Sequence, residues 1–187
     1  MEVADVDLIS WRGSGVLPPL LHAKKLADEL LEGGASLSDD GDDAAPLSVE
    51  RGLIANAKKL SLLALGVAAQ KYGAKIDEEQ QVLGNVADIV IETYAMESAY
   101  LRTMKHVSSR GAAESETMIN MTRLYVNEAM GKLDLWSREF LAACASGDEL
   151  RTMLAAARRL TKYTPIDASH LRLEIAKGFI EKGKWEI

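Results

Sequence analysis

Aromatic residues make up only 5% of this 187-residue chain, which also has a single cysteine and fewer basic than acidic residues. Cys144 cannot form an internal disulfide, so nothing in the sequence indicates an oxidising compartment. It lies in FLAACAS without a neighbouring base to lower its thiol pKa, which favours a core residue over a nucleophile. The net charge of -6 disfavours nucleic acid, whose phosphates are bound by a surplus of lysine and arginine.

Long hydrophobic runs and targeting signals are also missing. The longest apolar run, LLALGVAA at 62–69, is much shorter than the roughly 20 residues that span a bilayer. The first residues, MEVADVDLIS, are acidic and lack the basic start and the small-residue cleavage site of a secretory signal. We therefore expect a cytoplasmic protein that does not insert into a membrane.

Helix-forming residues, in contrast, are abundant. Alanine, leucine, methionine, glutamate and lysine are frequent, and only four prolines interrupt them. The composition, 48% hydrophobic and 27% charged, is that of a globular protein. The length suits one domain with a substantial core. These features predict an all-α fold, an antiparallel helical bundle of four to six helices.

Changes in composition divide the chain into four regions. Residues 1–16 show no sustained period, so they are predicted as a leader without clear structure. Residues 17–31 carry an apolar stripe after two prolines and are predicted as a first helix. Residues 32–47, which contain EGGASLSDDGDDAAP, are predicted as an acidic flexible linker without the spacing of an EF-hand. Residues 48–187 are predicted to form the helical bundle domain.

Capping residues and helix breakers subdivide the bundle region into five predicted helices. Their ranges are 48–72, 77–109, 114–145, 146–163 and 167–182. The signals are N-caps at Ser48 and Asp167, capping boxes formed by Asp77 with Gln80 and by Ser146 with Glu149, and stops at Gly73, Gly111 and Pro165. Two of these helices have about 30 residues and are therefore roughly 45 Å long.

The helix 77–109 has an unusually wide apolar face. One stripe comprises Val82, Val86, Ile89, Met96, Tyr100, Met104 and Val107, and an adjoining one comprises Leu83, Ala87, Val90, Tyr94 and Leu101. A helix with two adjoining stripes is expected to contact at least two neighbours and to leave only a narrow polar strip in solvent.

Three carboxylates on this helix are the first candidates for a site. Asp88 and Glu92 share the polar strip with Arg102 and His106, because steps of four and fourteen residues return to nearly the same face. Both carboxylates are therefore predicted to be solvated. Glu97 has apolar neighbours and is predicted to lie at the edge of the core, paired with a base.

Catalytic and metal-binding patterns are not found. Ferritin-like bundles hold two irons with added Glu-x-x-His motifs on two helices. Of the three histidines here, only His170 has an acid three positions earlier, and that acid, Asp167, is assigned to a cap. The sequence also lacks a P-loop, a dinucleotide fingerprint, a Gly-x-Ser-x-Gly elbow and a Cys-x-x-Cys pair. We therefore assign no catalytic, cofactor-binding or metal-binding residue.

One basic cluster, Arg158, Arg159 and Lys162, leaves two interpretations open. It falls in the last turns of the helix 146–163, where cations offset the negative end of the helix dipole. That structural role is favoured, and a phosphate or coenzyme A site is the alternative.

Three stretches together carry a family resemblance: QKYGAKIDEEQQVLGNVADIVIETYAMESAYLR at 70–102, MTRLYV at 121–126 and DELRTMLAAARRLTKYTPID at 148–167. They resemble the C-terminal extension of bacterial acyl-CoA dehydrogenases of the very long-chain type. LPPLLHAKKLADELL resembles the segment leading into that extension, so the similarity covers about residues 17–187.

The resemblance implies a parent flavoprotein of fatty acid β-oxidation. In this family FAD accepts a hydride from the β-carbon of the acyl thioester, and a glutamate in a Phe-Glu-Gly-Thr-Asn type motif removes the α-proton. That motif and the flavin-contacting and acyl-binding segments are absent from this sequence. We therefore expect no cofactor and no catalysis in this chain alone.

The resemblance also implies partners. The domain is expected to pack on the dehydrogenase portion of the same enzyme, where it shapes a dimer, and the chain is expected to form a homo-oligomer. Its uncovered apolar residues are predicted to be Trp11, Leu17, Leu20, Leu21, Trp185 and Ile187. Membrane association is not expected, because the acidic linker would be repelled by anionic lipid. The alternative is a free-standing interaction module with no role in acyl-CoA oxidation.

Overall fold

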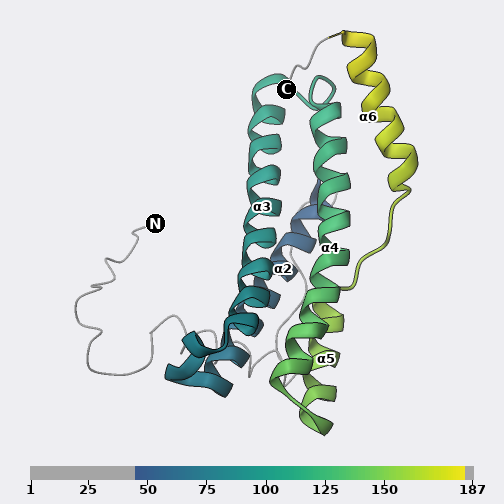
Figure 1. Ribbon diagram of the computed structural model, residues 1–187. Helices are drawn as coiled ribbons and strands as arrows, with labels where there is room; N and C mark the ends of the chain where they lie inside the picture. Colours follow the sequence, from purple (N-terminus) through teal and green to yellow (C-terminus); the bar gives the residue numbers. More distant parts are fainter. Residues whose placement is uncertain (1–44, 184–187) are drawn as a thin grey trace, which may run out of the picture.

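The computed structural model describes residues 45–183, and helices dominate that part of the chain (Figure 1). The elements are α2 (Ser48–Tyr72), the short 3-10 helix η2 (Gly73–Glu78), α3 (Gln80–Arg110), α4 (Glu116–Cys144), α5 (Gly147–Leu160) and α6 (Ala168–Lys182). α3 has 31 residues and α4 has 29. The predicted all-α bundle with two long helices is confirmed.

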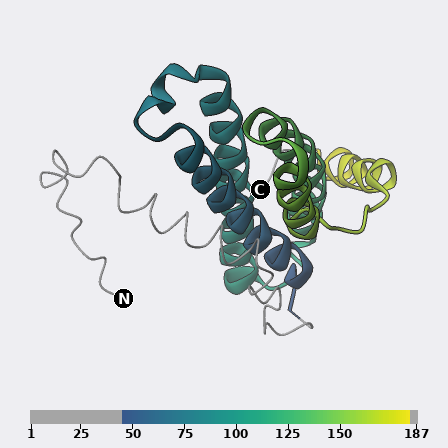
Figure 2. The same cartoon turned by 90° about the horizontal axis from the view of Figure 1, so that it is seen from below.

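Four helices form the body of the bundle, and α6 stands at its edge. α3 and α4 run side by side, α2 crosses behind them, and α5 packs against α4 and α2. Among the described elements α6 contacts only α4, and Figure 2 shows it on the side away from α2 and α3. No residue of α6 with a described side chain is buried. The core therefore lies between α2, α3, α4 and α5.

Side-chain pairs show that α2 and α3 run antiparallel. Lys58 of α2 pairs with Glu97 of α3, and the Ser61 hydroxyl donates to Thr93 Oγ1 over 3.1 Å. From Lys58 to Ser61 the residue number rises along α2, while the number of the contacted residue on α3 falls from 97 to 93. The start of α2 is therefore level with the C-terminal part of α3. Ser61 and Thr93 are buried and also bond backbone carbonyls one turn earlier, so their polar atoms are satisfied inside the core.

The core is apolar and contributed by every helix of the body. Its largest fully buried side chains include Leu60, Leu63, Ile89, Met96, Met130, Leu133, Phe140, Leu141 and Leu160. Full burial of a side chain of this size stabilises a fold by about 1.5–3 kcal/mol. Among the described residues every buried side-chain nitrogen and oxygen has a hydrogen-bond partner. Packing of apolar faces therefore holds the bundle together.

Glycines end α2 and α3 where the sequence predicts. Gly73 has a φ of 53° and Gly111 a φ of 86°, values that L side chains rarely adopt. After Gly73, however, the chain forms η2, and the prediction had assigned its last two residues, 77 and 78, to the next helix. α3 consequently begins at Gln80, later than the predicted start at residue 77.

The predicted caps at Ser48 and Asp77 are wrong. Ser48 is the first residue of α2, and Leu47 occupies the cap position with a left-handed φ of 62° and no side-chain cap bond. That conformation costs about 1–2 kcal/mol, whereas burying a leucine contributes about 1.5–3 kcal/mol, and Leu47 is only 2% exposed. Gln80 donates to the Asp77 carbonyl over 2.7 Å instead of forming a capping box. Neither helix therefore begins at a side-chain cap.

The predicted end of the fourth helix is also wrong. α5 ends at Leu160, whereas the prediction continued to Tyr163 before the stop at Pro165. The Thr161 hydroxyl bonds the carboxylate of Asp134 on α4 over 2.9 Å, so a contact with α4 lies at the end of the helix. At its start, Ser146 holds the predicted cap position but makes no side-chain cap bond, so no capping box forms.

The start of α6 agrees with the prediction. Asp167 is the N-cap, and its Oδ1 accepts a hydrogen bond from the backbone N–H of His170 over 3.0 Å. This bond satisfies one of the free N–H groups of the first turn. α6 ends at Lys182, as predicted.

Several predictions fall outside the described residues. These are the leader 1–16, the helix 17–31, most of the linker 32–47, and Trp185 with Ile187. Of the linker, only residues 45–47 are described.

One described stretch is long and apolar enough to cross a membrane. It covers Ser48–Glu78, within which an 18-residue window has a mean hydropathy of 1.3 and is 50% buried inside the bundle. Leu60, Leu63 and Val67 of this stretch belong to the core. A core helix passes the same test of length and composition, so this feature is weak evidence for a membrane. The sequence analysis, which considered only uninterrupted apolar runs, did not predict this candidate.

Candidate functional site

The sequence predicted that Glu92 is solvated, and this prediction is wrong. The Glu92 side chain faces α4 instead. Its side chain is 12% exposed, and its Oε1 accepts a hydrogen bond from Lys132 Nζ over 3.0 Å. Burial and the nearby Glu92 carboxylate together raise the pKa of Tyr125 on α4 to about 12. The phenol is therefore protonated near neutral pH and serves as a hydrogen-bond donor. α4 covers the part of the polar strip where Glu92 lies, and a pattern on one helix cannot show which neighbour covers it.

The other candidates on α3 lie closer to their predicted positions. Asp88 and Arg102 are exposed. Glu97 is 35% exposed and pairs with Lys58, which confirms the predicted base at the edge of the core. His106 is half-buried, and its Nδ1 lies 2.8 Å from the hydroxyl of Ser115, next to the start of α4. Glu92 and Glu97 thus lie on different sides of α3, and Asp88 is exposed without joining either ion pair, so the three carboxylates do not form one site.

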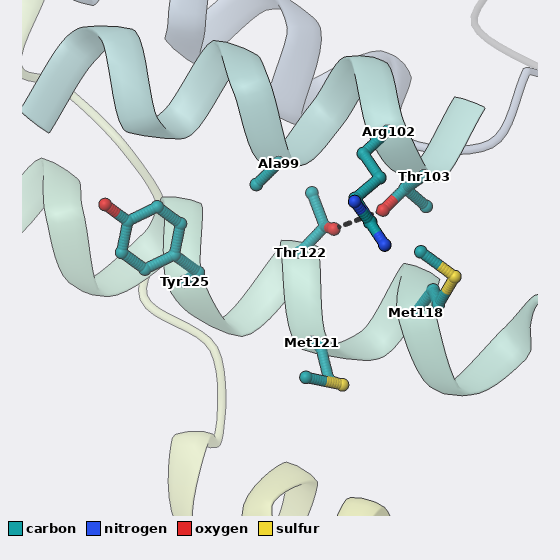
Figure 3. A pocket seen from close by; sticks show the side chains of 7 residues that line it. All are labelled: Ala99, Arg102, Thr103, Met118, Met121, Thr122 and Tyr125. Atoms are coloured by element: carbon teal, nitrogen blue, oxygen red, sulfur yellow. Dashed lines mark hydrogen bonds between the residues drawn. The ribbon is translucent and has the colours of Figure 1, made fainter. Parts of the chain in front are cut away.

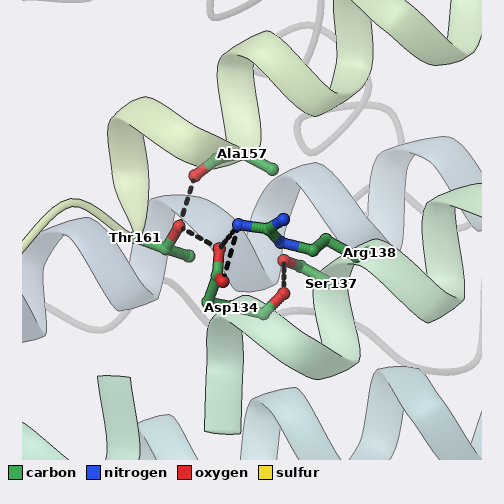
Figure 4. Close-up of polar contacts among 5 residues, drawn as sticks. All are labelled: Asp134, Ser137, Arg138, Ala157 and Thr161. Atoms are coloured by element: carbon green, nitrogen blue, oxygen red, sulfur yellow. Dashed lines mark hydrogen bonds and ion pairs between the residues drawn. The ribbon is translucent and has the colours of Figure 1, made fainter. Parts of the chain in front are cut away.

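A second polar cluster ties α4 to the end of α5 (Figure 4). Asp134 pairs with Arg138 over 2.8 Å along α4 and accepts a hydrogen bond from Thr161 over 2.9 Å. Thr161 also bonds the Ala157 carbonyl, and the Ser137 hydroxyl donates to the backbone oxygen of Asp134. Each of these donors bonds an acceptor within the cluster. The cluster therefore fixes the position of α5 on α4 and serves a structural role.

Two further ion pairs join different helices. Arg123 Nε of α4 lies 3.3 Å from Oε1 of Glu50, whose side chain is 10% exposed, and Arg172 of α6 pairs with Glu128 of α4. Each carboxylate faces a cation on another helix, which orients the helices relative to one another.

The basic cluster predicted from the sequence does not converge. Arg158 and Arg159 are exposed in the last turn of α5, as the dipole interpretation requires. Lys162 lies beyond the helix end and lines a cavity of about 300 Å³ with Arg123 and Glu50. Neither Arg158 nor Arg159 lines that cavity. The three cations therefore do not surround a single anion, and the structural interpretation is favoured.

The remaining candidates in the described part of the chain are the thiol of Cys144 and groups of metal-ligating side chains. Cys144 is buried, and this burial raises the pKa of its thiol, although Lys71 acts in the opposite direction. The thiol is therefore protonated at neutral pH. Residues 45–183 contain no group of three or more His, Cys, Asp or Glu side chains that could hold a metal ion.

A groove lies between α3 and α4 (Figure 3). It has a volume of about 370 Å³ and is lined by Ala99, Arg102, Thr103, Met118, Met121, Thr122 and Tyr125. Thr103 and Thr122 bond each other over 2.7 Å, which leaves Arg102 as the charged group of the lining. Met121 and Tyr125 also line a neighbouring cavity of about 450 Å³ between α4 and α6. These surfaces are suited to apolar contact.

The adjoining apolar stripe of α3 was expected to be covered, and the structure leaves most of it exposed. Val90 is 37% exposed, Leu101 56% and Tyr94 72%, and Ala87 is also exposed. Ile91, which the sequence analysis did not single out, is 63% exposed beside them. Its spacing of three residues from Tyr94 was the signal that could have placed it on this side.

Known proteins similar to this chain point to a single family. A family model described as "Acyl-CoA dehydrogenase, C-terminal domain" matches residues 56–159. A "Probable acyl-CoA dehydrogenase" of Bacillus subtilis (strain 168) is 40% identical over 173 residues, which is 92% of this chain. A crystal structure of an acyl-CoA dehydrogenase complexed with FAD from Bacillus anthracis matches with a TM-score of 0.82 and 38% identity over 91% of this chain. This chain spans only 28% of the length of each of these two relatives.

Proposed function

Because this chain belongs to the acyl-CoA dehydrogenase C-terminal domain family, we propose that it is the non-catalytic helical domain of an FAD-dependent acyl-CoA dehydrogenase of fatty acid β-oxidation. The domain packs on the dehydrogenase portion of the same polypeptide. The observation that carries this proposal is the match of nearly the whole chain to little more than a quarter of two such relatives. The resemblance noted in three stretches of sequence is thereby confirmed.

The groove between α3 and α4 does not fit FAD. A dinucleotide needs several donors for its pyrophosphate and for its ring edges. The groove between α3 and α4 offers mainly apolar side chains, two threonines bonded to each other, and Arg102. We therefore assign FAD to the dehydrogenase portion and derive no chemical step from this chain.

The domain acts through contact instead. Burial of its apolar surface against the dehydrogenase portion stabilises that portion, because each buried Å² contributes about 25 cal/mol. The covered face of the dehydrogenase portion is then unavailable for further subunits, which limits the enzyme to a dimer. A cytoplasmic location is part of the same proposal. It is supported by the acidic composition, which does not favour binding to anionic lipid.

Complex formation between separate chains tests the proposal. The chain of residues 1–187 is mixed with the Bacillus subtilis relative shortened to the part that precedes its match. We expect a stable complex in sedimentation velocity and a higher melting temperature of the flavin-loaded dehydrogenase portion. A dehydrogenase portion whose sedimentation and melting are unchanged by the chain would contradict the proposal and favour a free-standing module.

Flavin content provides the second half of the test. The purified chain alone is expected to be colourless and not to reduce an electron acceptor with any acyl-CoA, while the complex retains the flavin of its dehydrogenase portion. Stoichiometric flavin absorbance in the isolated chain would contradict the non-catalytic role.

A further inference from the structure

Basic side chains gather on one side of α3, next to the groove between α3 and α4. A cavity of about 320 Å³ is lined there by Arg102, Lys105, His106, Ser109, Arg110 and Met118. The other four α3 residues follow Arg102 by three, four, seven and eight positions, steps that return to one face of a helix. Among the described residues, none with a carboxylate lines this cavity or the groove.

Three of these basic side chains have no acidic partner. Within the described part of the chain Arg102, Lys105 and Arg110 form no ion pair, whereas Lys58 and Lys132 each pair with a carboxylate of α3. The helix dipole accounts for Arg110 in the last turn of α3, but its effect falls off before Lys105 and Arg102. Cations gathered without acids create a positive potential, which attracts an anion.

The apolar groove begins where this basic cavity ends. Arg102 and Met118 line both, and Figure 3 shows them next to each other at the end of the groove opposite Tyr125. From Met118 to Tyr125 the helix advances about 10 Å. Met121 and Tyr125 also line the cavity between α4 and α6. A basic end is therefore continuous with an apolar surface that extends from α3 across α4 to α6.

The lining of the groove is suited to a hydrocarbon chain. Thr103 and Thr122 bond each other over 2.7 Å, so their hydroxyl groups offer little to a polar ligand. Met118 and Met121 are only half-buried and leave apolar area for contact. Methionine is unbranched and flexible, which lets it adapt to apolar ligands of irregular shape.

We propose that this groove binds an amphiphile with an anionic head and a single hydrocarbon tail. The head, a carboxylate or a phosphate, lies among Arg102, Lys105 and Arg110, because guanidinium groups form paired, charge-assisted hydrogen bonds with these anions. The tail lies along Met118 and Met121 and continues towards α6. The inference goes beyond the proposed function, since the ligand undergoes no chemical step and its site is complete without the dehydrogenase portion.

Titration calorimetry of the folded 187-residue chain tests the site with four probes below their micelle-forming concentrations. Decanoate and decyl phosphate combine a tail with either head, decanol carries the tail alone, and acetate carries a head alone. We expect one saturable site for decanoate or decyl phosphate, and the tighter of the two identifies the head. Decanol and acetate should bind at least about tenfold more weakly, because each lacks either the charge-assisted bonds or the apolar burial. Added salt should weaken binding, since the cations are exposed.

Two matched double variants locate the bound probe. Arg102→Gln with Lys105→Gln removes two cations of the basic cavity, and Arg158→Gln with Arg159→Gln removes two cations of α5 that line neither the cavity nor the groove. All four residues are exposed, so both variants are expected to fold, which circular dichroism verifies. We expect the α3 variant to bind at least about tenfold more weakly, since hydrogen bonds to charged groups are lost. The α5 variant, with the same change in net charge, should stay within about twofold of the unaltered chain.

Equal binding by the α3 variant and the unaltered chain would overturn the inference, as would the absence of saturable binding. So would binding to vesicles of anionic phospholipid without binding of either monomeric probe, since the occupant would then be a membrane surface. The complex with the shortened Bacillus subtilis relative is titrated as well, and affinity within about twofold of that of the free chain is expected. Loss of binding in the complex would show that the dehydrogenase portion covers the groove, which overturns this inference and leaves the proposed function intact. If no complex forms, the proposed function fails, and titration of the chain alone still decides the inference.

Discussion

The two sides of α3 differ in what covers them, although both are apolar. Ile89 and Met96 on the inner side are fully buried by the other helices of the bundle, while Ile91 and Tyr94 on the outer side are mostly exposed. The same helical spacing predicts both sides, because periodicity reports that a residue is suited to burial and not which partner buries it. The difference separates residues that stabilise the domain from residues that the described helices leave exposed.

The largest loss of stability is expected from a substitution on the inner side of α3. Ile89→Ala removes a fully buried side chain and leaves a cavity in the core. We expect the free energy of unfolding to fall by about 2–5 kcal/mol. Urea denaturation measures it, and a loss below that of Tyr94→Ala would contradict the assignment of the two sides.

An intermediate effect is expected at the α4 flank. Glu92→Ala leaves Lys132 without its carboxylate and Tyr125 without an acceptor, at a site where the Glu92 side chain is 12% exposed. We expect a loss of about 1 kcal/mol, because the half-exposed lysine regains much of its hydration. Asp88→Ala, at an exposed position of the same strip, serves as the control and should change stability by less than about 0.5 kcal/mol. Equal losses for both variants would show that Glu92 is solvated after all.

Alkaline pH is expected to weaken the same flank. The folded state raises the pKa of Tyr125 from 10.0 to about 12, so its protonated form contributes stability that is complete below pH 10 and is lost as the pH rises towards 12. Tyr125→Phe has no proton to lose there. We expect the unaltered chain to lose more stability than this variant between pH 10 and 12, measured by denaturant unfolding at several pH values. Parallel pH profiles would contradict a raised pKa at Tyr125.

The smallest effect is expected on the outer side. Tyr94→Ala in the isolated chain removes a side chain that is 72% exposed, so the free energy of unfolding should change by less than about 0.5 kcal/mol. Urea denaturation of the isolated chain, compared with Ile89→Ala, measures it. A loss above about 1.5 kcal/mol would mean that Tyr94 is covered within the isolated chain.

The sequence predicted the helices well because the spacing of apolar residues, the glycines that end helices and the N-cap Asp167 are local signals. The ranges 48–72 and 167–182 and the stops at Gly73 and Gly111 agree with the structure. The predicted caps at Ser48 and Asp77 were wrong, because no side-chain cap bond forms at the start of α2 or of α3. The burial of Leu47 accompanies the start of α2, and the bond from Thr161 to Asp134 lies where α5 ends.

The candidate residues were predicted less completely for a related reason. Glu97 lies among apolar neighbours in the sequence, which predicted that it pairs with a base. The sequence did not identify that base, which the structure shows to be Lys58. Glu92 was assigned to solvent because its own helix places it beside Asp88, and only the position of α4 reveals Lys132 and Tyr125. The adjoining apolar stripe of α3 was predicted to be covered, and its Val90, Tyr94 and Leu101 are exposed instead.

Reactivity of a thiol at position 94 tests most directly the claim that the two sides of α3 differ in burial. Cys144 is buried with a raised thiol pKa, so it should react slowly, and a cysteine introduced by Tyr94→Cys becomes the fast-reacting group of the chain. Its labelling rate with a soluble thiol reagent is measured by mass spectrometry of the folded 187-residue chain and compared with the rate for Ile89→Cys. Leu173→Cys, at a position that is 60% exposed on α6, is the exposed reference. We expect position 94 to label as fast as position 173 and much faster than position 89, and equal rates at positions 94 and 89 would contradict the difference between the two sides of α3.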